Sequence, residues 1–353
     1  MHPYPRLTRP SHLSPSRGLL ALGFTLASAA ALLAGCGESS AGPVNGATGG
    51  TGGAGATTGV GGTGAGEPFG GFGGFGGLGG GGPTTGSIPD NVVLVQADIG
   101  AFGLGDEITG DGVGDTGVIG GEDGCNVLVG VVRDFKAAGE PGGHPDFQSF
   151  AGSSQTTGLV APDLGASGKP AYASKCEADV TGNCPFGQQT TSEERFDEWY
   201  RLVKDTNRAY LVYFEFAPNG GVSTFQSKRF FPLDGAGWGL SGEDEDGVSR
   251  NFHFTTELHT KFEYKGGETF AFSGDDDLWV FVNGKLALDL GGLHPEVTGS
   301  IDLDAIAAQV GIEPGKIYPL DLFHAERHTS ASNFRVDTNL AFVDCGEVIP
   351  DPQ

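Results

Sequence analysis

Three consecutive aspartates, Asp275, Asp276 and Asp277, stand between two apolar segments in the second half of this 353-residue chain. Adjacent carboxylates repel one another, so a folded protein seldom keeps three of them in an ordered segment without a counter-charge. Such oxygen-rich clusters suit a hard cation such as Ca²⁺, which takes about six to eight oxygen ligands. An acidic surface loop is the alternative. The flanks favour the metal site, because the run Leu278–Val282 and the Asn-Gly pair after it predict a strand and a hairpin that fix where the carboxylates point.

Short runs of β-forming residues, separated by turn residues, recur between Cys125 and Cys345. They are Val127–Val132, Tyr210–Phe216, Phe252–Thr256, Phe262–Tyr264, Thr269–Phe272, Leu278–Val282, Leu286–Leu290, Tyr318–Phe323 and Phe334–Phe342. This pattern is typical of an all-β fold, an antiparallel β-sandwich or barrel. Two short helical insertions interrupt it. One follows a capping box formed by Thr191 and Glu194, and the other is Leu303–Val310, which ends before a glycine.

Residues 1–36 have the pattern of a bacterial export signal. Three arginines precede the apolar segment Leu19–Leu33, which runs into Ala-Gly-Cys at Cys36. This ending resembles the lipoprotein signal-peptidase box, in which the cysteine becomes the lipidated first residue, so Cys36 is the predicted lipidation site. An ordinary secretory signal with a chance cysteine is the alternative. We expect membrane attachment only through this lipid, and Gly37 favours the outer membrane or cell surface because an aspartate there retains many lipoproteins at the inner membrane.

Composition changes twice before the folded part of the chain. Residues 37–89 are rich in glycine and bury too little apolar surface to fold, so they predict a flexible tether. Residues 90–124 follow as a first strand, at Val92–Ile99, and an acidic glycine-rich loop, at Gly105–Gly124. The folded domain is expected at residues 125–347.

Charge and cysteine content narrow the function classes. The formal net charge of −24 excludes functions that need a basic surface, such as binding to nucleic acid or to anionic lipid. Besides Cys36 the chain has four cysteines, an even number that favours disulfides in an exported protein. Of three possible connectivities we favour the short closure Cys176–Cys184 with the long clasp Cys125–Cys345.

Several motifs together resemble the fibro-slime domain of bacterial surface proteins and slime-mould extracellular proteins. They are Arg133-Asp134-Phe135, His144-Pro145-Asp146-Phe147, Phe230-Phe231-Pro232-Leu233-Asp234, Phe252–Leu258, the aspartate triplet, Asp289–His294 and Phe323–Thr329. That domain is similar in turn to the PA-fourteen (protective-antigen) family of β-sandwich modules, many of which bind carbohydrate. The resemblance therefore implies a sandwich and a glycan-binding or adhesive role.

The calcium-dependent lectins of that wider family hold the ion with two adjacent aspartates joined by a cis peptide. The matching positions are Asp275 and Asp276, and Asp277 is either a third ligand or solvated. A later loop usually completes the shell with an asparagine, but Ala325 stands at that position here. The resemblance then implies that Glu326 supplies the missing oxygen, with Asn333 as the alternative.

Three further side chains are candidates for contact with a ligand. Trp238 lies in a glycine-rich turn, where an exposed ring can stack on a sugar. His294 follows a Gly-Gly pair and could line the same rim as the aspartates, and His328 lies in the later loop. The order of residues around His328 is not that of a zinc protease helix, and adjacent aspartates fit the geometry of a glycosidase acid and base poorly.

These observations predict a non-enzymatic, lipid-anchored surface module that binds extracellular polysaccharide or glycoconjugate with the help of Ca²⁺. The alternative is a structural or assembly protein of the cell envelope or extracellular matrix, in which Ca²⁺ only rigidifies the loops. A glycan-active enzyme is the third possibility.

Overall fold

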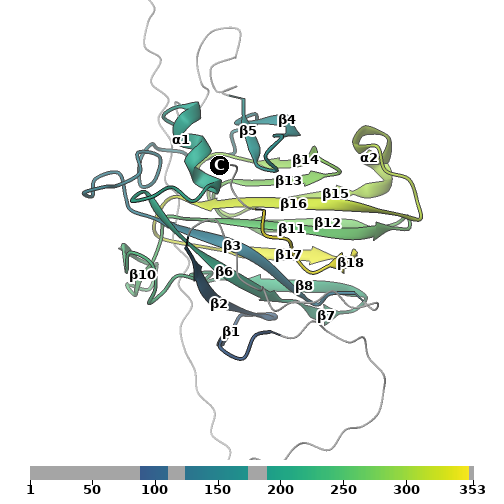
Figure 1. The fold of residues 1–353 in the computed structure, drawn as a ribbon, viewed down its shortest axis with the longest axis horizontal. Coiled ribbons are helices and arrows are strands. Elements are labelled where there is room, and N and C mark those ends of the chain that lie inside the picture. Colours follow the sequence, from purple (N-terminus) through teal and green to yellow (C-terminus); the bar gives the residue numbers. More distant parts are fainter. Residues whose placement is uncertain (1–87, 110–123, 174–188, 350–353) are drawn as a thin grey trace, which may run out of the picture. The chain divides into compact units, whose positions relative to one another are not determined.

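The computed structural model describes residues 88–109, 124–173 and 189–349 (Figure 1). The predicted export signal, lipidation site and tether, most of the acidic glycine-rich loop, and the pair Cys176 and Cys184 lie outside the described residues. Among those that are described, none of the helices has the length and apolar character needed to cross a membrane.

Two antiparallel sheets make up most of the described fold (Figure 1). The larger runs in the order β1 (Leu94–Gln96), β2 (Ala101–Ile108), β6 (Asn207–Glu215), β3 (Val127–Phe135), β11 (Phe254–Tyr264), β16 (Lys316–Glu326), β13 (Leu278–Val282), β14 (Lys285–Leu290), β4 (Val160–Leu164) and β5 (Pro170–Tyr172), and β18 (Ala341–Asp344) also pairs with β11. The smaller runs in the order β15 (Val297–Asp302), β12 (Thr269–Gly274), β17 (Phe334–Thr338), β8 (Val222–Ser227) and β7 (Ala217–Asn219). A separate hairpin joins β9 (Gly242–Glu243) to β10 (Ser249–Arg250).

A phenylalanine-rich core fills the space between the two sheets. Phe225 and Phe334 of the smaller sheet pack with Phe214 of the larger one, with ring centroids 5.3 to 5.9 Å apart. Edge-to-face and offset arrangements of this kind add to the free energy gained by burying the rings. The prediction of an all-β, PA-fourteen-like fold is confirmed, and the two packed sheets make it a sandwich.

Strand β13 is buried on both faces, because successive side chains of a strand point to opposite sides. Leu278, Val280 and Val282 join the core between the sheets, whereas Trp279 and Phe281 belong to a second apolar cluster on the outer face of the large sheet. A segment between β5 and β6 covers this outer cluster. It contains α1 (Glu193–Asp197) and the short 3-10 helix η2 (Glu198–Tyr200), and it contributes the buried residues Phe196, Trp199 and Tyr200.

Most predicted elements are present, with local differences. Strand β13 and helix α2 (Leu303–Val310) have the predicted bounds, and Gly311 ends α2 in a left-handed conformation with φ 73°. Helix α1 is capped by Ser192, not by Thr191. The capping prediction was wrong because the backbone N–H and hydroxyl of Thr191 both donate to the buried carboxylate of Asp146.

Two other expectations differ from the structure. The predicted loop from Gly105 begins inside β2, which pairs with β6 and belongs to the large sheet. The runs Phe252–Thr256 and Phe262–Tyr264 are parts of one long strand, β11. The predicted disulfide between Cys125 and Cys345 is present, and it joins positions 220 residues apart.

Candidate functional site: an acidic pocket at one end of the sandwich

Three connections that pass from one sheet to the other meet at one end of the sandwich. Residues 275–277 join β12 to β13, residues 291–296 join β14 to β15, and residues 327–333 join β16 to β17. They lie together because Leu278, at the start of β13, pairs with Leu290 at the end of β14 and with His324 near the end of β16.

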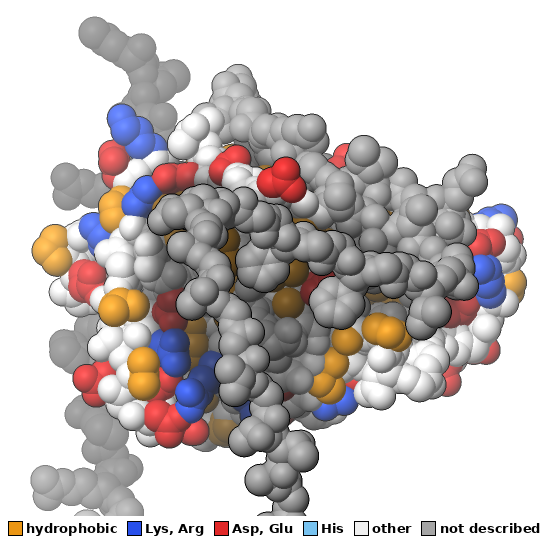
Figure 2. All heavy atoms as spheres, turned by 90° about the horizontal axis from the view of Figure 1, so that it is seen from below, with side chains coloured by type: hydrophobic (Ala, Val, Ile, Leu, Met, Phe, Trp, Pro, Cys, Tyr) orange, Lys and Arg blue, Asp and Glu red, His pale blue; other side chains and the backbone are white. Residues whose placement is uncertain are grey.

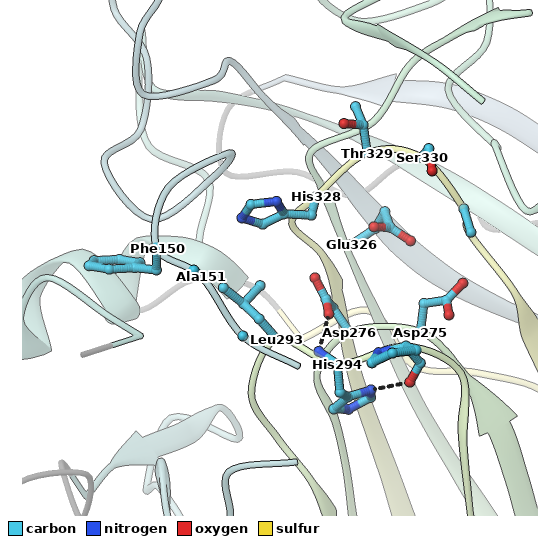
Figure 3. A pocket seen from close by; sticks show the side chains of 13 residues that line it. Phe150, Ala151, Asp275, Asp276, Leu293, His294, Glu326, His328, Thr329 and Ser330 are labelled. Carbon is cyan, nitrogen blue, oxygen red and sulfur yellow. Dashed lines mark hydrogen bonds between the residues drawn. The ribbon is translucent and has the colours of Figure 1, made fainter. Parts of the chain in front are cut away.

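The three connections and a loop between β3 and β4 enclose a pocket of about 480 Å³ (Figure 3). It is lined by Phe150, Ala151, Gly152, Asp275, Asp276, Leu293, His294, Pro295, Glu326, His328, Thr329, Ser330 and Ala331. Five residues singled out from the sequence therefore line one cavity, whose volume lies in the usual range of ligand sites. Lysine and arginine are absent from the described residues that line it.

Asp276 and Glu326 are neighbours on adjacent strands. Leu278 pairs with His324 in an antiparallel ladder, and the ladder continues where Ala325 N–H donates to the carbonyl of Asp277 at 3.0 Å. Counting two residues outward on each strand therefore places Asp276 opposite Glu326 on the inner face. Like charges in this position repel across the strand pair.

Both of these carboxyl groups are buried and each has an oxygen without a partner. Asp276 Oδ1 accepts a hydrogen bond from the backbone N–H of His294 at 2.8 Å, whereas Asp276 Oδ2 and Glu326 Oε2 have no hydrogen-bond partner. Burial raises the pKa of Asp276 to about 7. Burial, and then the charge of Asp276, raise the pKa of Glu326 well above its usual range. Two unpartnered, buried acceptors on one face leave a place for a cation or a strong donor.

Asp275 is also buried, and Asn333 holds it. Asp275 Oδ2 accepts hydrogen bonds from the backbone N–H of Asn333 at 2.8 Å and from its side-chain amide at 2.7 Å. Burial raises the pKa of Asp275. Asn333 thus orients this carboxylate through two N–H donors.

The peptide bond between Asp275 and Asp276 is trans. The cis bond implied by the resemblance is therefore not present, and the cis peptide bond of the described residues joins Thr329 to Ser330. The trans form is the ordinary state of a peptide bond that does not precede proline, and the cis form costs about 3–4 kcal/mol.

Asp277 points to the opposite face of the strand and has its own counter-charge. Its Oδ2 accepts from Arg327 Nε at 2.5 Å, and its Oδ1 accepts from the backbone N–H of Gly292 at 2.6 Å. Both side chains of this ion pair are fully buried, and the guanidinium carbon lies 4.7 Å from the centre of the Trp199 ring. Asp277 is neither solvated nor a free ligand. It joins the aspartate triplet to the loops on either side.

Both predicted histidines line the pocket, and backbone groups hold them. The ring nitrogens of His294 lie 2.8 Å from the carbonyl of Leu290 and 2.9 Å from that of Pro295 (Figure 3). The Nε2 atom of His328 lies 2.7 Å from the carbonyl of Ser149. These contacts fix the rims of the cavity.

Trp238 does not line the pocket. Its ring faces two cations instead, with Lys136 Nζ 4.1 Å and the guanidinium carbon of Arg208 5.6 Å from the ring centre. Its backbone N–H donates to the buried carboxylate of Asp134. Trp238 is 40% exposed, as predicted, and a role in ligand contact stays a prediction for a surface outside this pocket.

The donor set of the pocket fits a hard cation. Asp275, Asp276 and Glu326 supply carboxylate oxygens, the ligand type that Ca²⁺ takes in proteins. Within the described parts of the chain, no three His, Cys, Asp or Glu side chains stand in a ready-made metal-binding arrangement. The fit therefore rests on the unpartnered oxygens of the inner-face pair, and binding would require these side chains to close around the ion.

Sequence reasoning missed two parts of the site. Arg327 follows Glu326 directly, so strand alternation places the two on opposite faces and could have paired Arg327 with Asp277. The wall formed by residues 150–152 had no local signal, because it enters the site only through the tertiary fold.

Comparison with known proteins agrees with this architecture. Residues 230–353 match the family model of the PA14 domain. This part of the chain is similar to the PA14 domain family. The matched residues hold all three sheet-switching connections, whereas the PA14 domain shares its large sheet with β1 to β6, which precede the matched range.

Relatives are found in the slime mould Dictyostelium discoideum. Protein psiR is 34% identical over 216 residues, which are 57% of this chain and 20% of the relative. Protein psiD is 38% identical over 190 residues, covering 52% of this chain and 36% of the relative. Protein psiC is 35% identical over 209 residues, covering 57% of this chain and 39% of the relative. The chain thus spans between a fifth and two fifths of the length of these relatives.

Two solved structures are similar to parts of this chain at low scores. The PA14 domain of the MpAFP antifreeze protein is 10% identical, with 38% of this chain and 80% of that chain covered and a TM-score of 0.23. The epithelial adhesin 6 A domain of Candida glabrata, solved in complex with Galb1-3GlcNAc, is 16% identical. The match covers 57% of this chain and 86% of that chain, with a TM-score of 0.22. Likenesses at these scores carry no argument about the ligand of this chain.

Proposed function

We propose that this protein is an exported surface module that binds extracellular polysaccharide or glycoconjugate and so supports adhesion. Its PA14 domain would hold Ca²⁺ in the acidic pocket, and a lipid on Cys36 would anchor the chain. The proposal is supported by the match of residues 230–353 to the PA14 family model, by the pocket at the sheet-switching end, and by the export pattern of residues 1–36.

The main support for a bound cation is the pair Asp276 and Glu326. They face each other on the inner side of two paired strands, they are 4% and 1% exposed, and each keeps one oxygen without a partner. A buried pair of carboxyl groups, each with one unpartnered oxygen, costs free energy when ionised, and a bound cation removes this cost. Arg327, the nearest cation of the described residues around Asp276, is already paired with Asp277.

When bound, Ca²⁺ would offer coordination positions to sugar hydroxyls. The residues of the chain prepare the site around it. Asn333 orients Asp275, the backbone N–H of His294 orients Asp276, and the Arg327–Asp277 ion pair holds the aspartate triplet against the neighbouring loops. Leu293 gives the cavity an apolar wall.

Charge narrows the class of glycan. The chain carries a formal net charge of −24, and the described pocket lining has no lysine or arginine to pair with an acidic sugar. Neutral saccharides therefore fit better than uronates or sialylated chains. The same charge argues against nucleic acid as a partner. The donors form no acid and base pair around a scissile bond, so we propose a binding module and not an enzyme.

Calorimetric titration of the purified full chain with CaCl₂, followed by a glycan array with Ca²⁺ or with EGTA, tests the proposal. We expect Ca²⁺ binding that is lost in Glu326→Gln, and glycan binding that is lost with EGTA. Glu313→Gln is the matched control, because Glu313 is an exposed glutamate that pairs with Lys316 far from the pocket. An absence of Ca²⁺ binding would falsify the cation site.

A purely structural role for Ca²⁺ gives a different result. In that case Ca²⁺ raises the melting temperature while the array shows no bound glycan with or without the ion. For the anchor, metabolic labelling of the expressed chain with a radioactive fatty acid should label the wild type and leave Cys36→Ser unlabelled. A label that persists in Cys36→Ser would place the lipid elsewhere.

A further inference from the structure

Phe150 differs from the other phenylalanines of this protein. Every phenylalanine that the structure describes is buried except Phe150, which is half-buried and lines the pocket. Figure 3 shows it at the end of the cavity away from Asp275 and Asp276, with Leu293 between. An aromatic ring that could have been buried in a phenylalanine-rich core instead stands at the mouth of a polar cavity.

The backbone holds Phe150 in an unfavourable conformation. Its φ is 56°, and Gln148, two residues earlier, has φ 51°. Residues with a Cβ adopt this left-handed region at a cost, which persists only where surrounding contacts enforce it. Such strain at a binding surface is consistent with a functional constraint on the position of the ring.

Contacts on both sides enforce the loop. Gln148 N–H donates to the carbonyl of Arg327 at 2.8 Å, and its side-chain oxygen accepts from the backbone N–H of Thr329 at 3.2 Å. The Ser149 carbonyl lies 2.7 Å from His328 Nε2. On the other side, a Cβ built on Gly152 would lie 2.2 Å from the Leu293 carbonyl, so only glycine allows this close approach. The loop is thus fastened to the connection that follows Glu326 and to the connection that contains His294.

Packing within the protein does not explain the position of the Phe150 ring. Phe147, three residues earlier, is fully buried and stacks on Phe135 with ring centroids 4.4 Å apart. Phe150 belongs to none of the apolar clusters of the described residues, and no described aromatic ring packs against it. A partly buried aromatic side chain that lines a cavity is a ready contact surface for a ligand.

We propose that Phe150 and Leu293 form a subsite for a second sugar ring of a bound oligosaccharide. The inference rests on the proposed glycan-binding function. The first sugar occupies the acidic end, and the C–H face of the next pyranose packs on the Phe150 ring across Leu293. The ligand is then a neutral oligosaccharide. Contact with Phe150 gives it a higher affinity than the corresponding monosaccharide has.

The test compares matched mono-, di- and trisaccharides of glucose, galactose, mannose and N-acetylglucosamine on the full chain with Ca²⁺. We expect the wild type to bind one di- or trisaccharide more tightly than its monosaccharide. Phe150→Ala should reduce that preference about three- to tenfold, the range expected for loss of an aromatic contact, while monosaccharide affinity is unchanged. Phe150→Tyr should keep the preference. Leu240→Ala, at an exposed apolar residue outside the pocket lining, is the matched control.

Stability separates a ligand contact from a structural role. Phe150→Gly should raise the melting temperature, because glycine adopts φ 56° without strain, and it should lose the oligosaccharide preference as Phe150→Ala does. A lower melting temperature in both variants would overturn the subsite, since the ring would then be a packing element. Equal losses for mono- and oligosaccharides, or no loss, would overturn the subsite and leave calcium-dependent binding intact. If the wild type binds none of these sugars with Ca²⁺, the proposed function and the subsite both fail.

Discussion

Replacing Asp276 with asparagine should stabilise the calcium-free protein. In the wild type, burial raises the pKa of Asp276 from 3.8 to about 7, and the charge of Asp277 adds to this while Arg327 opposes it. At about 1.4 kcal/mol per pH unit, a difference of about 3 units corresponds to about 4 kcal/mol. This is an upper value for the free energy that Asp276→Asn recovers at neutral pH.

The sign follows from proton linkage. A carboxyl group with a raised pKa binds its proton more tightly in the folded state than in the unfolded state. The cost of ionising Asp276 is therefore absent below pH 3.8, grows between pH 3.8 and 7, and is complete above pH 7. Asparagine keeps the oxygen that accepts from the His294 N–H, so the variant removes the charge and retains this hydrogen bond. Its advantage over the wild type should rise with pH over the same interval.

Calcium should make the wild type more stable than Asp276→Asn, the reverse of the order without calcium. The wild type gains stability as Ca²⁺ binds, by about 2.7 kcal/mol at a free concentration one hundred times the Kd. Asp276→Asn lacks one ligand charge and should gain much less. Urea denaturation at pH 7.5, with EDTA and then with CaCl₂, measures both free energies, and Glu313→Gln again serves as the control. The reasoning is refuted if Asp276→Asn is less stable than the wild type in EDTA, or if both gain equally from Ca²⁺.

Three further predictions concern the frame of the site. Arg327→Met should cost about 3–5 kcal/mol of unfolding free energy by leaving Asp277 buried and unpaired, and the double variant with Asp277→Asn should recover part of it; a double-mutant cycle in urea measures this. Burial lowers the pKa of His259, but hydrogen bonds to two buried carboxylates outweigh it and raise the pKa overall. The stability of the wild type should therefore fall as pH rises above 6.5. Melting curves across pH should show this fall in the wild type and not in His259→Gln. Replacing Cys125 and Cys345 with alanine should cost about 5 kcal/mol, measured as the shift in urea midpoint.

The floor of the pocket could be predicted because strand chemistry places it. The apolar run Leu278–Val282 and its Asn-Gly turn define a hairpin, and the aspartates must then lie at its open end. Glu326 is predicted by the resemblance alone, and the structure places it at the end of β16, the strand that pairs with this hairpin.

Other parts depend on contacts that local pattern does not encode. Strand β2 was missed because Gly105 lies within it, and glycine usually weakens a strand. The structure explains the glycine, since a Cβ there would lie 2.7 Å from the ring of Tyr213. The exposure of Trp238 could be predicted from its glycine-rich turn, but the nearby cations Lys136 and Arg208 could not, because they come from distant parts of the chain.

The two ends of the pocket are built by different means, and this separates their roles. The acidic end lies on residues next to paired strands, where the ladders of β13 and β16 fix the positions of Asp276 and Glu326. The apolar end lies on a loop that no strand constrains, fastened by the contacts of Gln148 and by the close approach of Gly152. Cation affinity should therefore change little when this loop changes sequence, whereas the preferred saccharide should change with it. In related chains that keep the sandwich, specificity would then vary in a segment that precedes the PA14-matched residues.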